Sequence, residues 1–121
     1  MIVAPTARED LAVRAITFAA AGTAGQRCTT LRRLYVHDSR YEQIVTRLQR
    51  AYASLPVGHP AREGTLVGPL VDGAAFEAMQ AALAAARAAG GIVHGGERVS
   101  VAGLDGGFYV RPAIVELKGP I

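Results

Sequence analysis

The sequence has 121 residues, of which 50% are hydrophobic and 19% are charged. This length and balance fit one small globular domain and exclude a disordered chain. The formal net charge is only +3, and the arginines are scattered among positions with acidic neighbours. We therefore expect neither a nucleic acid nor a membrane as a partner of this chain.

Cys28 is the single cysteine, so it cannot form a disulfide within the chain, and nothing indicates an oxidising compartment. The first ten residues, MIVAPTARED, have no basic segment followed by an apolar one, so no secretory signal is predicted. The apolar stretch LAVRAITFAAAG is too short to span a bilayer. The expected location is the cytoplasm.

The first predicted helix begins at Thr6, because Thr6 and Glu9 have the spacing of a capping box. Its apolar face is predicted to consist of Leu11, Ala15, Phe18 and Ala19. Gly22 and Gly25 are expected to end the helix, since glycine adopts the left-handed geometry that other residues resist. This places Cys28 in a turn just beyond the helix end.

Residues 31–37, LRRLYVH, are rich in aliphatic and aromatic side chains and are predicted to form a short strand. A second capping box, Ser39 with Glu42, opens the clearest helix of the sequence. The predicted apolar stripe of that helix consists of Tyr41, Ile44, Val45, Leu48 and Leu55. Pro56 and Gly58 are expected to stop it.

Residues 57–72 alternate prolines and glycines with aliphatic residues and are predicted to be an ordered loop. Asp72 can cap a third helix, which Gly90 and Gly91 end. The apolar face of this helix is predicted to carry Phe76, Met79, Leu83 and Ala86. Three further strands are predicted in residues 91–96, 98–103 and 108–117.

The order of helix, strand, helix, helix and strands favours an α/β fold over a helical bundle. We expect a mixed, largely parallel sheet with crossover helices. No repeat, low-complexity run or linker divides the chain, so residues 1–121 are predicted to form one unit.

Cys28 is the strongest candidate for chemistry. A thiolate attacks carbonyl carbon readily, and cationic groups favour its formation. Arg27 is adjacent, and Arg32 and Arg33 follow closely. Such arginines can bind a carboxylate, but they can also lie in solvent or in local ion pairs. From the residues alone, the alternative is that Cys28 is a small buried apolar side chain.

Metal and nucleotide sites have no clear signature in the sequence. His37, His59 and His94 lack the spacing of metal ligands, so no metal site is predicted. A dyad between Cys28 and one of these histidines stays open. The stretches GGIVHGG and GLDGGF have neither the Rossmann nor the phosphate-loop spacing, and we interpret them as turns.

The stretch GTAGQRCTT resembles the catalytic-cysteine segment of the NAD(P)-dependent aldehyde dehydrogenases. Their Gly-Gln-x-Cys motif corresponds here to Gly25, Gln26, Arg27 and Cys28. The resemblance continues in order through RRLYVHDSRYEQIVTRL, VGHPAREGTLVGPLVD, GGIVHGGERV and GFYVRPAIVEL, and so covers nearly the whole chain. Within the family, Arg27 and the later Arg-Arg pair look most like the antiquitin-type branch, which oxidises α-aminoadipic semialdehyde in lysine breakdown.

The resemblance implies that Cys28 is the nucleophile, forming first a thiohemiacetal and then a thioester. It implies that Arg27 holds the substrate's carboxylate, that NAD or NADP accepts the hydride, and that the full-length parent is a homo-oligomer. Family members are several times longer, and their general-base glutamate and oxyanion-hole asparagine precede this segment. We therefore expect residues 1–121 to be part of a catalytic domain, without a complete dinucleotide-binding domain and inactive alone. Its cofactor-binding residues are unknown.

Two other functions stay open at this point. The chain can belong to another branch of the superfamily that acts on a different aldehyde. It can also be a non-catalytic α/β module that binds another subunit through exposed apolar surface.

Overall fold

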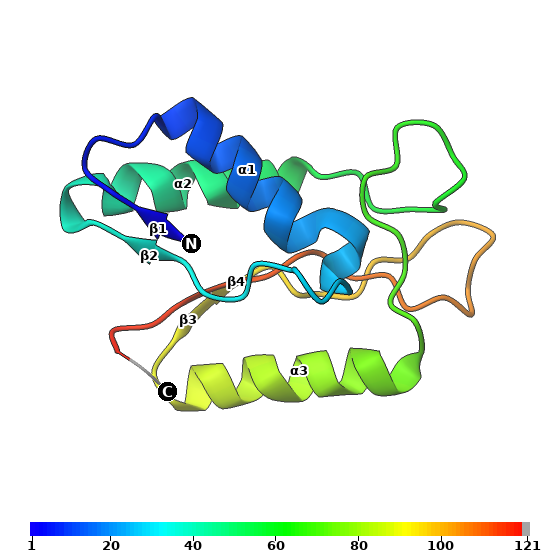
Figure 1. The fold of residues 1–121 in the computed structure, drawn as a ribbon. Helices are drawn as coiled ribbons and strands as arrows, with labels where there is room; N and C mark the ends of the chain where they lie inside the picture. Colours follow the sequence, from blue (N-terminus) through cyan, green and yellow to red (C-terminus); the bar gives the residue numbers. More distant parts are fainter. Residues whose placement is uncertain (120–121) are drawn as a thin grey trace.

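The computed structural model describes residues 1–119, and the last two residues of the predicted 1–121 unit, Pro120 and Ile121, lie outside the described residues. The elements are β1 (Ile2–Val3), α1 (Glu9–Ala21), the 3₁₀ turn η1 (Gly22–Gly25), β2 (Tyr35–Val36), α2 (Asp38–Ser54), α3 (Gly73–Ala88), β3 (Ile92–His94) and β4 (Ile114–Glu116). Helices α1 and α2 pack together on one side, α3 lies on the other, and β3 and β4 run between them (Figure 1). The predicted α/β fold is confirmed. Across residues 1–119, every helix is too short or too polar to cross a membrane.

The strands pair in both senses. β1 and β2 are parallel, with Val3 opposite Val36, and α1 forms the crossover between them. β3 and β4 are antiparallel, with Val93 opposite Val115. The mixed pairing and the crossover helix agree with the prediction. Among the described residues, however, the strands form two separate two-stranded sheets instead of one continuous sheet.

The predicted strands are shorter than their apolar runs. Residues 98–103 form no strand, and only Arg98 makes an isolated bridge, to Val110. β3 stops at His94 because Gly95 and Gly96 adopt φ of 74° and 87°, which lie outside the range of an extended strand. These glycines end the strand, as a glycine break would, but they form no hydrogen-bonded turn.

Neither predicted capping box forms. α1 begins at Glu9, three residues later than expected, and its N-cap residue Arg8 makes no side-chain cap. The Glu9 carboxylate instead accepts a hydrogen bond from Arg47 of α2 at 2.8 Å. α2 begins at Asp38, where His37 caps the helix by accepting from the Ser39 N–H through Nδ1. A residue outside the four-residue pattern therefore caps α2, whereas the N-cap residue of α1 provides no side-chain cap.

The buried face of α1 also differs from the prediction. Leu11 and Phe18 are 61% and 69% exposed, whereas Val13 and Ile16 are buried. Nearly every side of α1 is apolar, so the helical period alone does not select a face, and contact with α2 decides it. The resulting core cluster consists of Val3, Val13, Ile16, Ile44, Leu48 and Tyr52.

The third helix agrees with its prediction. The Asp72 carboxylate accepts from the Ala75 N–H at 2.8 Å and so caps α3. Leu83 and Ala86 are buried on its inner face. The helix ends at Ala88, and Gly90 follows with φ of 83°. The cap fixes Asp72, the last residue of the 57–72 loop, at the start of α3.

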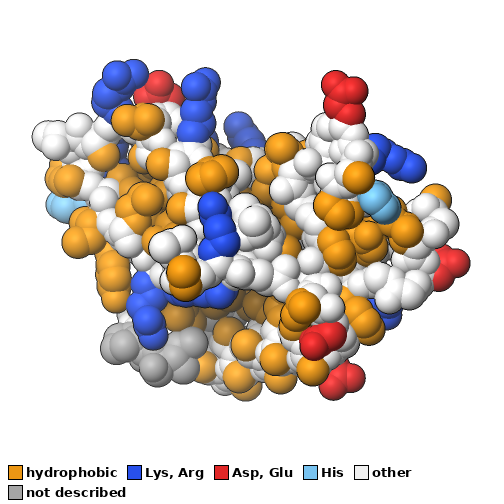
Figure 2. All heavy atoms as spheres, turned by 45° about the vertical axis from the view of Figure 1, so that its right-hand side comes forward, with side chains coloured by type: hydrophobic (Ala, Val, Ile, Leu, Met, Phe, Trp, Pro, Cys, Tyr) orange, Lys and Arg blue, Asp and Glu red, His pale blue; other side chains and the backbone are white. Residues whose placement is uncertain are grey.

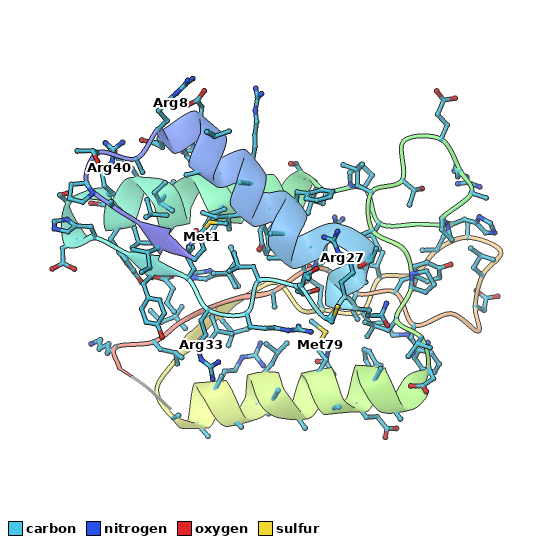
Figure 3. The ribbon with its side chains drawn as sticks, viewed as in Figure 1. Met1, Arg8, Arg27, Arg33, Arg40 and Met79 are labelled. Atoms are coloured by element: carbon cyan, nitrogen blue, oxygen red, sulfur yellow. The ribbon has the colours of Figure 1, made fainter. Side chains whose placement is uncertain are left out.

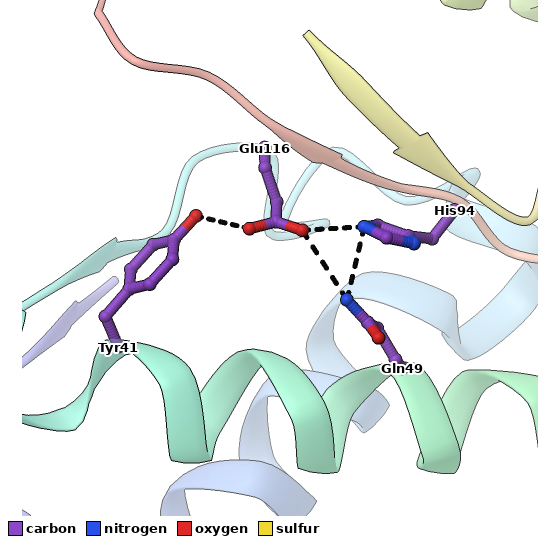
Figure 4. A network of polar contacts seen from close by, with 4 residues as sticks. All are labelled: Tyr41, Gln49, His94 and Glu116. Atoms are coloured by element: carbon purple, nitrogen blue, oxygen red, sulfur yellow. Dashed lines mark hydrogen bonds and ion pairs between the residues drawn. The ribbon is translucent and has the colours of Figure 1, made fainter.

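A polar network joins α2 to the antiparallel strand pair β3–β4 (Figure 4). The Tyr41 hydroxyl donates to Glu116 Oε2 at 2.6 Å. A carboxylate only accepts hydrogen bonds, so the other oxygen, Oε1, accepts a hydrogen bond from the Nε2–H of His94 at 2.6 Å. Gln49 Nε2 lies 3.5 Å from the same oxygen. The hydrogen bond between Tyr41 and Glu116 raises the pKa of the Tyr41 hydroxyl to about 12 and lowers the pKa of the Glu116 carboxyl.

Replacing Glu116 with Gln is expected to lower the free energy of unfolding at pH 7 by about 1–2 kcal/mol, because charged hydrogen bonds are lost. The pKa of Glu116 is lowered from its usual 4.5 in the folded state. Its contribution is therefore complete above pH 4.5 and is lost as the pH falls through the lowered folded-state pKa. Urea unfolding at pH 7, 5 and 3 should show the wild type and variant converging in acid. Glu42→Gln, at an exposed glutamate of α2, is the control, and a gap that does not change with pH contradicts the assignment.

Apolar side chains reach the surface over much of the face shown in Figure 2. They come from several elements and not from one helix or strand alone. The large apolar residues that are more than half exposed are Ile2, Leu11, Phe18, Tyr35, Leu66, Val71 and Ile92.

Candidate functional site around Cys28

The helix end before Cys28 turns through left-handed backbone. The Gly22 N–H still bonds to the Phe18 carbonyl, and η1 follows. Thr23 and Ala24 then have φ of 53° and 54°, and Gly25 has φ of 71°. The predicted glycine ending is therefore confirmed, but two residues with side chains share the left-handed geometry. Such strain is found most often at functional sites, where neighbouring contacts hold it.

Cys28 lies at the tip of the next turn, as predicted. The Thr30 N–H donates to the Arg27 carbonyl at 3.0 Å, and the Arg27 N–H donates to Thr30 Oγ1 at 3.1 Å. These two bonds close the turn and leave the Cys28 side chain exposed. The alternative that Cys28 fills the core is wrong for this structure.

Two contacts tie the far side of this turn back to the end of α1 and to η1. The Leu31 N–H donates to the Ala19 carbonyl at 2.9 Å. Arg32 Nη2 donates to the Gly25 carbonyl at 2.8 Å. The segment before Cys28 and the segment after it are therefore both fixed to the end of the same helix.

The Arg27 side chain folds back over the end of α1 (Figure 3). Its Nη2 donates to the Phe18 carbonyl at 3.0 Å, and the guanidinium lies 4.8 Å from the centre of the Phe18 ring. The partial negative charge at a helix C-terminus favours a cation at this position. A side chain at Gly22 would collide with Nη2, so the Arg27 guanidinium would have to shift to make room for it. Nε is buried and has no partner among the described residues.

Gln26 is a residue of the motif to which the sequence assigned no role. Its side-chain amide reaches the 57–72 loop: Nε2 donates to the Pro69 carbonyl at 3.2 Å, and Oε1 accepts from the Val71 N–H at 2.8 Å. These partners lie 43 and 45 positions away in the sequence, so no local pattern predicts them.

The three histidines are engaged elsewhere. His37 caps α2, His59 Nδ1 accepts from the Ala61 N–H at 3.1 Å, and His94 bonds to Glu116. The dyad between Cys28 and a histidine, which the sequence left open, is therefore not formed within residues 1–119. In the same range, no three metal-ligating side chains come together.

Gly91, Gly95 and Gly96 of the GGIVHGG stretch pack closely against the chain itself, whereas nothing lies within 4 Å of the Cβ position of Gly90. A Cβ atom at Gly95 would meet the Pro112 carbonyl oxygen, and one at Gly96 would meet a methyl of Leu83. The chain's own atoms therefore fill the space on the Cβ side of Gly95 and Gly96, where a phosphate would have to approach these two backbones. Two surface hollows, one beside His59 and one beside His94, are lined by neither Cys28 nor Arg27.

The sequence profile of the aldehyde dehydrogenase family matches residues 1–118. The chain belongs to the aldehyde dehydrogenase family. It is 48% identical over 119 residues to the aldehyde dehydrogenase family 7 member A1 of Pisum sativum, covering 98% of this chain and 23% of that protein. It is 43% identical over 107 residues to the α-aminoadipic semialdehyde dehydrogenase of Bos taurus, covering 88% and 19%. The predicted resemblance to the antiquitin-type branch is confirmed.

The fold comparison agrees with the family assignment. An aldehyde dehydrogenase from Bacillus cereus, solved as an NAD⁺ complex, superimposes with a TM-score of 0.85 at 26% identity, over 94% of this chain and 23% of that one. The chain therefore spans about a quarter or less of the proteins that it matches.

Proposed function

We propose that this chain is the cysteine-bearing part of the catalytic domain of an NAD(P)-dependent aldehyde dehydrogenase that oxidises α-aminoadipic semialdehyde. The observation that supports this most is the exposed Cys28 at the tip of a turn that is held to the end of α1 by Leu31 and to η1 by Arg32. The similarity to the bovine enzyme named for this substrate supports the choice of aldehyde.

In the proposed reaction, the Cys28 thiolate attacks the aldehyde carbon and forms a thiohemiacetal oxyanion. Backbone N–H groups of the turn, that of Cys28 among them, are suited to stabilise the oxyanion. NAD or NADP supplies the hydride acceptor, and we propose that it binds outside residues 1–119. Loss of hydride leaves a thioester on Cys28, and water hydrolyses it to the carboxylate and the free thiol.

We propose that the 121-residue chain does not turn over alone. Glu9, a carboxylate that lies on α1, is paired with Arg47, and neither surface hollow contains Cys28. A general base, an oxyanion-hole side chain and the dinucleotide site would come from further chain. The exposed apolar residues of α1 and the 57–72 loop would then be covered within the complete enzyme or its homo-oligomer.

Arg27 is proposed to bind the carboxylate of the substrate. Arg27 directly precedes the nucleophile in the sequence. Nη2 is already bound to the Phe18 carbonyl and Nε is buried, so the carboxylate would use Nη1.

Arg27→Met in the full-length enzyme is expected to raise KM for α-aminoadipic semialdehyde about tenfold or more, because one charged hydrogen-bonded pair is lost. The KM of a simple aliphatic aldehyde should change less than about threefold. NADH formation with each aldehyde measures both. Arg33→Met, at an exposed arginine, is the control. Equal increases in both KM values would mean that Arg27 only holds the end of α1, and equal wild-type rates with both aldehydes would contradict the choice of substrate.

The intact mass of the polypeptide from its native cell tests whether these residues belong to a longer enzyme. A much heavier chain supports the proposal. A mass that matches 121 residues favours the non-catalytic subunit-binding module instead.

A further inference from the structure

The side-chain amide of Gln26 is used on both its nitrogen and its oxygen. Nε2 donates to the carbonyls of Pro69 and Thr23, each at 3.2 Å. Oε1 accepts from the Val71 N–H at 2.8 Å. The amide therefore pairs with a carbonyl and an N–H two residues apart, in the way that a neighbouring strand would.

Residues 69–71, which Gln26 contacts, are themselves held by other parts of the fold. The Leu70 N–H donates to the Phe108 carbonyl at 2.8 Å, and the Leu70 side chain is buried. Asp72 follows at once and caps α3. Gln26 thus connects the Cys28 segment to a rigid part of the fold that is anchored on its other side.

The segment that Gln26 belongs to needs such support. Its own N–H donates to the Thr23 carbonyl at 3.1 Å, which closes the left-handed turn through Thr23 and Ala24. Strained backbone of this kind persists only where surrounding contacts determine it. Cys28 follows two residues later, so the position of its sulfur depends on where this turn is held.

We propose that Gln26 is a positioning residue for Cys28. By holding the turn against residues 69–71, it sets the place from which the sulfur attacks the aldehyde carbon. Gln26 takes no part in the chemistry. The inference rests on the proposed function of Cys28 as the nucleophile.

Amide hydrogen exchange in the 121-residue protein tests the positioning directly. Gln26→Met keeps the length of the side chain and removes its donors and acceptor. The Val71 and Thr30 amides should then exchange about tenfold faster or more, while the Leu70 amide, bonded to Phe108, stays unchanged. Gln43→Met, at an exposed glutamine of α2, should alter none of them. Faster exchange at Val71 with unchanged exchange at Thr30 would overturn the proposal.

A second variant covers the case in which Gln26→Met does not fold. Gln26→Glu keeps the acceptor for the Val71 N–H and loses both donated bonds. Its Thr30 amide should exchange faster than that of the wild type, and an unchanged Thr30 amide would again overturn the proposal.

Kinetics of the full-length enzyme separate the two proposals. Gln26→Met should lower kcat about tenfold or more and change KM for the dinucleotide less than about threefold, because only the placement of the sulfur changes. A normal kcat in Gln26→Met beside an inactive Cys28→Ser would overturn the positioning role alone. An active Cys28→Ser would overturn the proposed function.

Discussion

Cys28→Ser in the full-length enzyme is expected to lower kcat for aldehyde oxidation by roughly 10³-fold or more. A serine hydroxyl is a weak nucleophile without a base to take its proton, and the histidines of the described chain are engaged elsewhere. Wild-type enzyme quenched during turnover should carry an acyl group on the peptide that contains Cys28, detected by mass spectrometry. The variant peptide should carry none.

Thr29→Ser is the matched control for this experiment. Thr29 shares the exposed tip of the turn with Cys28, and the substitution also leaves a hydroxyl there. It should keep kcat within about twofold. Because Cys28 is exposed, neither substitution should alter the thermal unfolding of the 121-residue chain. A Cys28→Ser enzyme within tenfold of the wild type, or an acyl group on another residue, would contradict the nucleophile assignment.

Gly95→Ala is expected to lower the free energy of unfolding by about 3 kcal/mol, the largest loss of stability that we predict for one added methyl group. Gly95 has φ of 74°, which costs an alanine about 1–2 kcal/mol. The new Cβ would also meet the Pro112 carbonyl oxygen, and such overpacking costs about 1–3 kcal/mol more. Urea unfolding of the 121-residue chain measures the change.

Gly103→Ala separates the two causes. Gly103 has φ of 77°, but no atom lies within 4 Å of the position where its Cβ would be. This variant should lose only about 1–2 kcal/mol, from the backbone strain alone. Equal losses in the two variants would show that the Pro112 contact adds nothing. A smaller loss at Gly95 would mean that the glycine is not required for packing there.

The sequence predicted the parts of the site that short-range rules determine. Two glycines near a helix end indicate a turn, and Cys28 lies in one. Asp72 caps α3 because the cap and its N–H partner are three residues apart. The position of Gln26 was visible in the family motif, but its function depends on Pro69 and Val71, which only the folded chain brings near.

In the fold, too, local residue patterns were predictable, whereas contacts between residues far apart in the sequence were not. The α/β order and crossover were predictable because element types follow from local residue patterns. The buried face of α1 was not, since Leu11 and Phe18 are as apolar as the buried Val13 and Ile16. The start of α2 was missed for a related reason. His37, a residue that helix-start rules do not favour, supplies the capping group.

The contact between Tyr41 and Glu116 also bears on the order of folding, because the two residues are 75 positions apart. Closing so long a loop has an entropy cost that must be met before the contact forms. The contacts among β1, α1, β2 and α2 lie within residues 1–54 and close much shorter loops. We therefore expect residues 1–54 to fold early and the β3–β4 strand pair to pack against α2 late. The strand that carries Glu116 would then be among the last parts of the chain to fold.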